Sequence, residues 1–85
     1  MFKYTKHQLK KLEDLFSALG YALRYEKGSF QAGYCLVEHR KIAVVNKFYD
    51  TEARINCLVD ILGNIEINTE LLTEETKKLY EKLSN

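Results

Sequence analysis

The spacing of apolar residues divides the chain into helix-like and strand-like segments. In residues 5–20 the apolar positions recur every three or four residues, which predicts an amphipathic helix. The positions of this stripe are Leu9, Leu12, Phe16 and Leu19. Thr5 followed by Gln8 is the capping-box pattern of a helix start, and Gly20 is typical of a left-handed helix end.

The next segment, residues 21–47, has the alternation and the β-branched content of strands. The pattern predicts strands at about 21–26, 29–38 and 41–47. Lys27-Gly28 is typical of a two-residue hairpin turn. We therefore expect the three strands to form an antiparallel meander, each paired with the next along the chain.

Two short runs in this segment, residues 35–37 and 42–45, are apolar at consecutive positions. Successive side chains of a strand point to opposite faces of the sheet, so a strand with one face in water alternates apolar and polar residues. We therefore expect both faces of the sheet to be covered, either by helices of this chain or by a second subunit.

Two further helices are predicted after the strands. Asp50 is a favourable N-cap for a helix over residues 51–62, and a short helix begins near Thr73. Residues 65–68 are either a short extra edge strand or an extended link. The expected fold is a single α+β domain spanning residues 1–85, with the order α-β-β-β-α-α.

Composition favours a small globular protein of the cytoplasm. The chain has 85 residues, of which 46% are hydrophobic and 29% charged, so it is not of the disordered class. The apolar run needed to cross a bilayer, about 20 residues, is absent, and the N-terminus has no apolar run typical of a signal peptide. Cys35 and Cys57 lack the spacing of a zinc or redox motif, so we interpret both as free thiols.

Charge is unevenly distributed along the chain. Residues 1–47 carry nine Lys/Arg and four Asp/Glu, whereas residues 48–85 carry four and eight, so the halves are +5 and −4. This asymmetry suggests either a basic surface for an anionic partner or pairing between oppositely charged subunits.

The stretch "KIAVVNKFYDTEARINCLVDIL", residues 41–62, resembles the strand-to-helix passage of zincin-type peptidases. That family needs two histidines one helical turn apart with a glutamate as base. Val59 and Gly63 occupy the two ligand positions here, and Asp60 the base position. The resemblance therefore implies a zincin-like scaffold that lacks its metal site.

Other catalytic arrangements are also missing. Cys35 and His39 lie four residues apart, about 13 Å along an extended strand, which is too far for a nucleophile and its base. The "GSFQAG" segment, residues 28–33, opens no helix and so does not match a phosphate-binding loop. We expect no enzymatic activity, no cofactor and no metal, and the roles of Cys35, His39 and Asp60 stay open.

Aromatic and basic residues are interleaved in the middle of the chain, and we interpret them as an interaction surface. The candidate residues are Arg24, Tyr25, Lys27, Phe30, Lys47, Phe48, Tyr49 and Arg54. Such residues favour a protein interface or a core. A basic sheet with exposed aromatics is also able to stack the bases of single-stranded nucleic acid.

The segments "RYEKGSFQAGYC" and "VVNKFYDTEARIN" together resemble a family of short, uncharacterised bacterial proteins. That family has no assigned activity, so the resemblance implies a cytoplasmic bacterial setting and transfers no catalytic residue.

From these patterns we expect a non-enzymatic cytoplasmic protein-interaction module that self-associates, for example as a homodimer. The alternative is a single-stranded nucleic-acid-binding protein that uses the basic N-terminal half. A third hypothesis is the zincin-like scaffold, which requires Cys35 and Asp60 to line one cleft.

Overall fold

The computed structural model describes residues 3–28 and 33–84 of the chain. The fold belongs to the α+β class, as expected. In chain order the elements are α1 (Lys6–Ala18), β1 (Ala22–Glu26), β2 (Tyr34–Val37), the 3-10 turn η1 (Glu38–Arg40), β3 (Ile42–Asn46), α2 (Thr51–Leu62), the 3-10 turn η2 (Thr69–Leu71) and α3 (Glu74–Ser84).

Both ends of α1 follow from local sequence signals. The hydroxyl of Thr5 accepts a hydrogen bond from the Gln8 N–H at 3.1 Å, which confirms the predicted N-cap. At the other end Gly20 has a φ of 84°, and the Tyr21 N–H donates to the Phe16 carbonyl at 2.9 Å. This is the Schellman pattern, in which a left-handed glycine lets the chain leave the helix.

The other helices also begin where the caps predict. The Asp50 carboxylate accepts from the Ala53 N–H at 2.9 Å, so α2 spans the predicted residues 51–62. The Thr73 hydroxyl accepts from the Thr76 N–H at 3.2 Å at the start of α3. Residues 65–68 form no strand in the structure and link α2 to η2, with a bend at Ile65.

The strand order differs from the expected meander. The sheet has the order β1-β3-β2, with β1 parallel to β3 and β2 antiparallel to β3. The predicted hairpin at Lys27-Gly28 is therefore wrong, because β1 and β2 are not neighbours. β3 has the most apolar sequence of the three strands, IAVVN. In the central position its backbone is paired on both edges and its inward side chains are buried.

A short turn joins the two antiparallel strands without glycine. After η1, Lys41 takes a left-handed conformation with a φ of 51°, and its N–H donates to the Glu38 carbonyl at 3.0 Å. The turn contains no glycine, asparagine or aspartate, which is why its type was not predictable.

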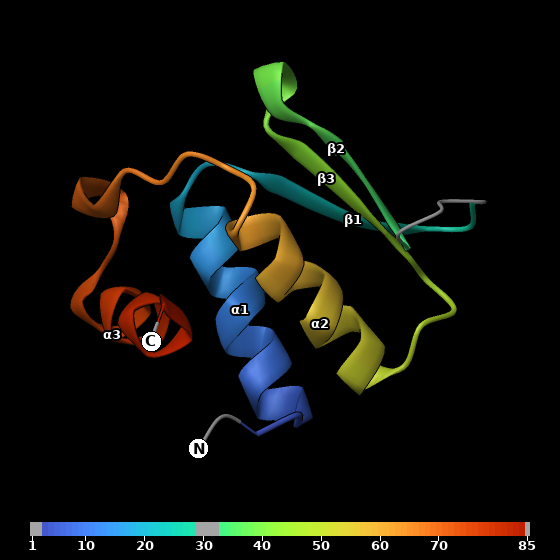
Figure 1. Cartoon of the computed structure of the whole chain (residues 1–85), viewed down its shortest axis with the longest axis horizontal. Helices are drawn as coiled ribbons and strands as arrows, with labels where there is room; N and C mark the ends of the chain where they lie inside the picture. Colours follow the sequence, from blue (N-terminus) through green and yellow to red (C-terminus); the bar gives the residue numbers. More distant parts are fainter. Residues whose placement is uncertain (1–2, 29–32, 85) are drawn as a thin grey trace.

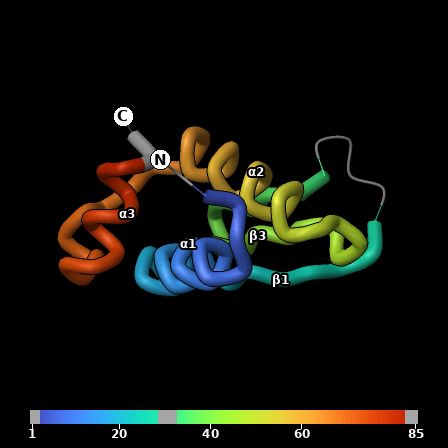
Figure 2. Tube along the Cα trace, turned by 90° about the horizontal axis from the view of Figure 1, so that it is seen from below, coloured from blue at the N-terminus to red at the C-terminus, as the bar shows by residue number. Residues whose placement is uncertain are grey.

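The helices cover only one side of the sheet. In Figure 1, α1 and α2 lie on the same side of the three strands, and no helix lies on the other side. Figure 2 shows α3 beside α1 and away from the sheet. The fully buried core side chains are Leu12, Leu15, Phe16, Ala43, Val45, Ile55, Leu58 and Ile61. Within the described part of the chain, no helix is long and apolar enough to span a membrane.

Candidate interaction site on the outer face of the sheet

We call the side of the sheet away from α1 and α2 the outer face. Ala43 and Val45 of β3 are fully buried against the helices, so their neighbours in the strand point outward. The pairing register then aligns three side chains per row across the sheet. The outer rows are Ala22-Ile42-Val37 and Arg24-Val44-Cys35, and Glu26-Asn46 lies beyond them.

The centre of the outer face is apolar. Val37, Ile42 and Val44 lie side by side there, and no helix or strand of the described chain covers them. They are half-buried, and Cys35 beside them is exposed. An apolar patch bordered by charged residues is the usual composition of a protein-binding surface.

Arg24, a predicted interaction residue, lies at the border of this patch. Its Nε lies 2.8 Å from the Glu26 Oε2, and both side chains are about half exposed or more. An ion pair this exposed contributes roughly 0–1 kcal/mol to stability. Its main effect is that the β1 edge of the outer face carries both signs of charge.

Two more of the predicted residues lie on the inner side instead. The guanidinium of Arg54 stacks over the ring of Tyr25, with its Cζ 4.3 Å from the ring centroid. The hydroxyl of Tyr25 donates to the Glu13 Oε2 at 2.6 Å, which ties β1 to α1. Burial of the ring, and then this hydrogen bond, raise the pKa of Tyr25 above its ordinary value.

Arg54 also orders the connection between β3 and α2. Its Nε donates to the Tyr49 carbonyl at 2.9 Å and its Nη2 to the Lys47 carbonyl at 2.7 Å. These bonds satisfy backbone groups of the connection, and explain why a cation lies in the first turn of α2 against the helix dipole. The position of Arg54 therefore reflects a structural role.

Tyr49 packs against Gly33, where β2 begins. A Cβ built on Gly33 would lie 2.4 Å from the Tyr49 Cε2, and Gly33 has a φ of 83°. Only glycine permits both this conformation and the close approach of the ring. Gly33 thus allows the ring to approach the backbone closely, and Tyr49 is an anchor of β2.

The remaining candidates lie near the chain connections. Phe48 is 69% exposed, and the Lys47 Nζ lies 5.4 Å from the centroid of its ring. Lys27 is exposed beyond β1, and Phe30 lies outside the described residues. The predicted residues are thus distributed over two faces and a loop, whereas Val37, Ile42 and Val44 of the outer face were not among them.

Cys35 and Asp60 do not share a cleft. The Tyr34 hydroxyl donates to the Asp60 Oδ2 at 2.6 Å on the inner side, and this bond is the main cause of the raised pKa of Tyr34. Cys35 follows Tyr34 in β2 and points to the outer face. Residues 3–28 and 33–84 contain no cluster of three or more His, Cys, Asp or Glu side chains that would hold a metal.

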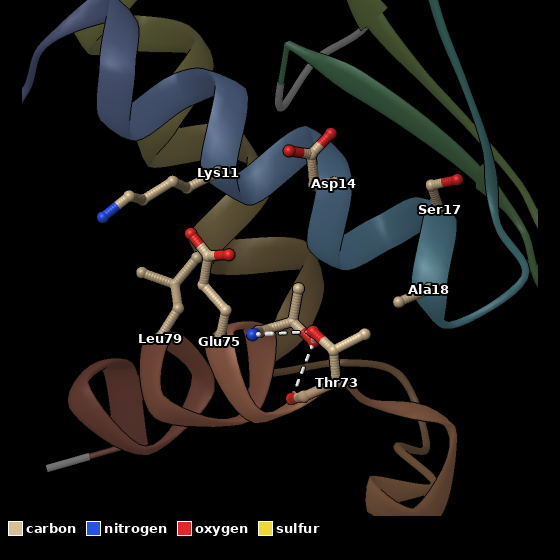
Figure 3. Close-up of a pocket in the computed structure, with 8 residues that line it drawn as sticks. Lys11, Asp14, Ser17, Ala18, Thr73, Glu75 and Leu79 are labelled. Carbon is tan, nitrogen blue, oxygen red and sulfur yellow. Dashed lines mark hydrogen bonds between the residues drawn. The ribbon is translucent and has the colours of Figure 1, made fainter.

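A pocket of about 330 Å³ lies between α1 and α3 (Figure 3). It is lined by Lys11, Asp14, Ser17, Ala18, Thr73, Glu75, Thr76 and Leu79. Two of its polar groups have local structural partners, since Asp14 pairs with Lys10 at 2.9 Å and the Thr73 hydroxyl caps α3. The lining offers no nucleophile paired with a base.

Comparison of the chain with protein-family models, with curated proteins and with solved structures finds no match. The functional interpretation therefore depends on the geometry of the outer face and of the sheet edges.

Proposed function

We propose that the chain is a non-enzymatic cytoplasmic protein-interaction module that associates through the exposed side of its sheet. One observation carries the proposal: no helix or strand of the described residues lies over the apolar patch of Val37, Ile42 and Val44 at the centre of the outer face. Burying such a row against a partner removes apolar surface from water at about 25 cal/mol per Å². The opposite net charges of the two halves of the chain suggest a second copy of the chain as the partner.

Sedimentation equilibrium at tens of micromolar tests the proposal. The wild-type chain is compared with the Val44→Lys variant in 150 mM and 500 mM salt. We expect the wild-type chain to associate at both salt concentrations, because apolar burial is not screened by ions. The Val44→Lys chain should remain folded by circular dichroism and sediment with a dissociation constant at least tenfold higher.

Equal association of the two chains would remove the outer face from the proposal. A monomeric wild-type chain at these concentrations would remove self-association and leave only a different protein as partner.

The alternative, binding of single-stranded nucleic acid, draws support from Phe48 and Lys47, an exposed aromatic ring beside an ammonium group. This arrangement suits base stacking and phosphate contact. Retention of a labelled single-stranded oligonucleotide that falls steeply with salt, and is lost in Phe48→Ala, would favour this alternative. An unshifted oligonucleotide at low salt would exclude it.

A further inference from the structure

In the part of the chain that the structure describes, β1 and β2 are the two edges of the sheet, and they differ in how they are protected from pairing with another strand. On β1 the edge carries the charged residues Arg24 and Glu26. On β2 the edge consists of Tyr34–Val37, sequence YCLV, with no charge and no proline. Charged residues and prolines are the usual means of keeping an edge strand from pairing with another chain. The β2 edge lacks both.

The hydrogen-bond pattern identifies which backbone groups of β2 are open. The Asn46 N–H donates to the Gly33 carbonyl at 2.9 Å, and Cys35 is aligned with Val44. In an antiparallel pair, alternate residues bond to the partner strand, so Cys35 and Val37 direct their backbone groups to β3. Tyr34 and Leu36 therefore direct their N–H and C=O groups to the open edge.

From this geometry we propose that two copies of the chain pair antiparallel through β2, with Cys35 of each copy at the two-fold axis. The inference shares only self-association with the proposed function, because it moves the contact between copies from the outer face to the β2 edge, and Val44→Lys therefore distinguishes the two. In this register Tyr34 lies opposite Leu36 of the second copy, so every open N–H and C=O of these residues is paired. The two sheets become one, and both copies keep their helices on the same side.

Neighbouring two-fold registers pair fewer groups. A register centred on Leu36 places Tyr34 opposite Glu38, which belongs to η1 and has left the extended conformation. A register centred between two residues would put inward-facing side chains opposite outward-facing ones, which the alternation of the strand forbids. The register centred on Cys35 is thus the one that the described part of the strand favours.

This register has a consequence for the cysteine. Cys35 and its symmetry mate form a non-hydrogen-bonded pair, in which the Cα atoms lie about 4.5 Å apart. Disulfides span Cα separations of about 4.4–6.8 Å. Cys35 is exposed, whereas Cys57 is buried. In this dimer the Val37 and Val44 side chains of both copies form one apolar strip across the joined outer faces.

Oxidation by diamide tests the register directly. Two Cys35 thiols lose two protons and two electrons to form one S–S bond, and diamide takes them up to become the hydrazine. We expect native protein at tens of micromolar to give a disulfide dimer at least tenfold faster than protein in 8 M urea. The Cys35→Ser variant should give no covalent dimer, yet should still sediment as a dimer.

Two variants distinguish the edge from the face. In a Cys35→Ser background, Val44→Cys places new thiols about 14 Å apart in the edge dimer, three strand spacings, so no disulfide is expected. In Cys35→Lys two ammonium groups meet at the axis, and we expect a folded monomer. Dimerisation that survives Val44→Lys but not Cys35→Lys supports the edge and excludes the outer face as the self-association surface.

The opposite results overturn the inference. A disulfide through Val44→Cys together with dimers of Cys35→Lys would show face-to-face packing, so the proposed function would stand without the edge register. A wild-type chain that is monomeric, and that diamide links no faster than in urea, would exclude the β2 dimer altogether.

Discussion

The inner and outer faces of the sheet are made by the same three strands, but they have different surroundings. On the inner face Ala43 and Val45 are fully excluded from solvent beneath α1 and α2. On the outer face the alternate residues Ile42 and Val44 have equally apolar side chains, and no helix or strand of residues 3–28 and 33–84 lies above them. Within β3 the apolar character is thus nearly symmetrical, while the burial is not.

The two faces of β3 therefore meet two different requirements, stability of the folded chain on the inner face and association on the outer face. The inner residues provide the core on which folding depends, because an 85-residue chain has little apolar surface to spare. The outer residues contribute less to the monomer, so their apolar character is better explained by association. Variants on the two faces should therefore have separable effects on stability and on assembly.

The largest effect is expected from Leu58→Ala on α2. Leu58 is fully buried against the inner face, and the change leaves a cavity in the core. We expect the free energy of unfolding to fall by about 2–5 kcal/mol, measured by urea denaturation. Asn56→Ala, at an exposed position of the same helix, should change it by no more than about 0.5 kcal/mol. Similar losses in both variants would contradict the assigned burial.

The next effect is expected from Gly33→Ala, at the start of β2. The left-handed conformation and the Tyr49 ring both oppose a Cβ, so we expect a loss of roughly 1–3 kcal/mol from the backbone strain alone. Since β2 depends on this contact for its alignment, the Cys35 thiol should also react at a changed rate with a disulfide reagent.

Gly63→Ala is the matched control for that change. Gly63 has a φ of −74°, and its added Cβ would lie 3.5 Å from the nearest atom, the Asp60 carbonyl oxygen. We expect it to be neutral or to stabilise by about 0.4–1 kcal/mol. A destabilisation equal to that of Gly33→Ala would contradict the assigned role of the left-handed conformation and the Tyr49 contact at Gly33.

The parts of the fold that depend on contacts between residues close in sequence were predictable, whereas those that depend on contacts between distant residues were not. The starts of α1 and α2 were predictable because Thr5 and Asp50 act on backbone groups three residues away. The strand order was not predictable, because alternation gives the face of each residue and does not identify its neighbouring strand. The central place of β3 depends on contacts between residues 20 apart in sequence, such as Ala22 and Ile42.

The candidate site was predicted in part for the same reason. The consecutive apolar residues of β3 correctly indicated a strand with two apolar faces. The selection of aromatic and basic residues did not distinguish side chains that pack inside the fold from side chains that lie on the surface. Arg54 stacks on the ring of Tyr25 and donates hydrogen bonds to the backbone of the β3–α2 connection, and both contacts depend on tertiary packing.

A direct comparison of the faces comes from Val45→Ala and Val44→Ala, the same change on adjacent residues of β3. Val45 is fully buried, so its loss should reduce the free energy of unfolding by about 2 kcal/mol. Val44→Ala should cost less than about 1 kcal/mol in the monomer, and should weaken association. Denaturation at 1 µM protein and sedimentation at 50 µM separate the two effects, and equal losses of stability would contradict the asymmetry.

The smallest effect is expected from Tyr25, a residue of β1 on the inner face. Its pKa is raised, and its hydroxyl bonds to Glu13 of α1. Because burial and the Glu13 bond raise its pKa, the folded state holds the phenolic proton more tightly than the unfolded chain does. Its contribution is complete below the unfolded pKa of about 10 and is lost as pH rises through the folded value. Tyr25→Phe should lower stability by about 1 kcal/mol at pH 7 and flatten the decline above pH 10.

Urea denaturation between pH 7 and pH 11 measures both parts of this prediction. Tyr4→Phe is the control, since Tyr4 is 49% exposed at the N-terminal side of α1. It should leave the alkaline decline unchanged. An alkaline decline as steep in Tyr25→Phe as in the wild-type chain would show that the phenol does not couple the inner face to α1. The stability of that face would then depend on apolar packing alone.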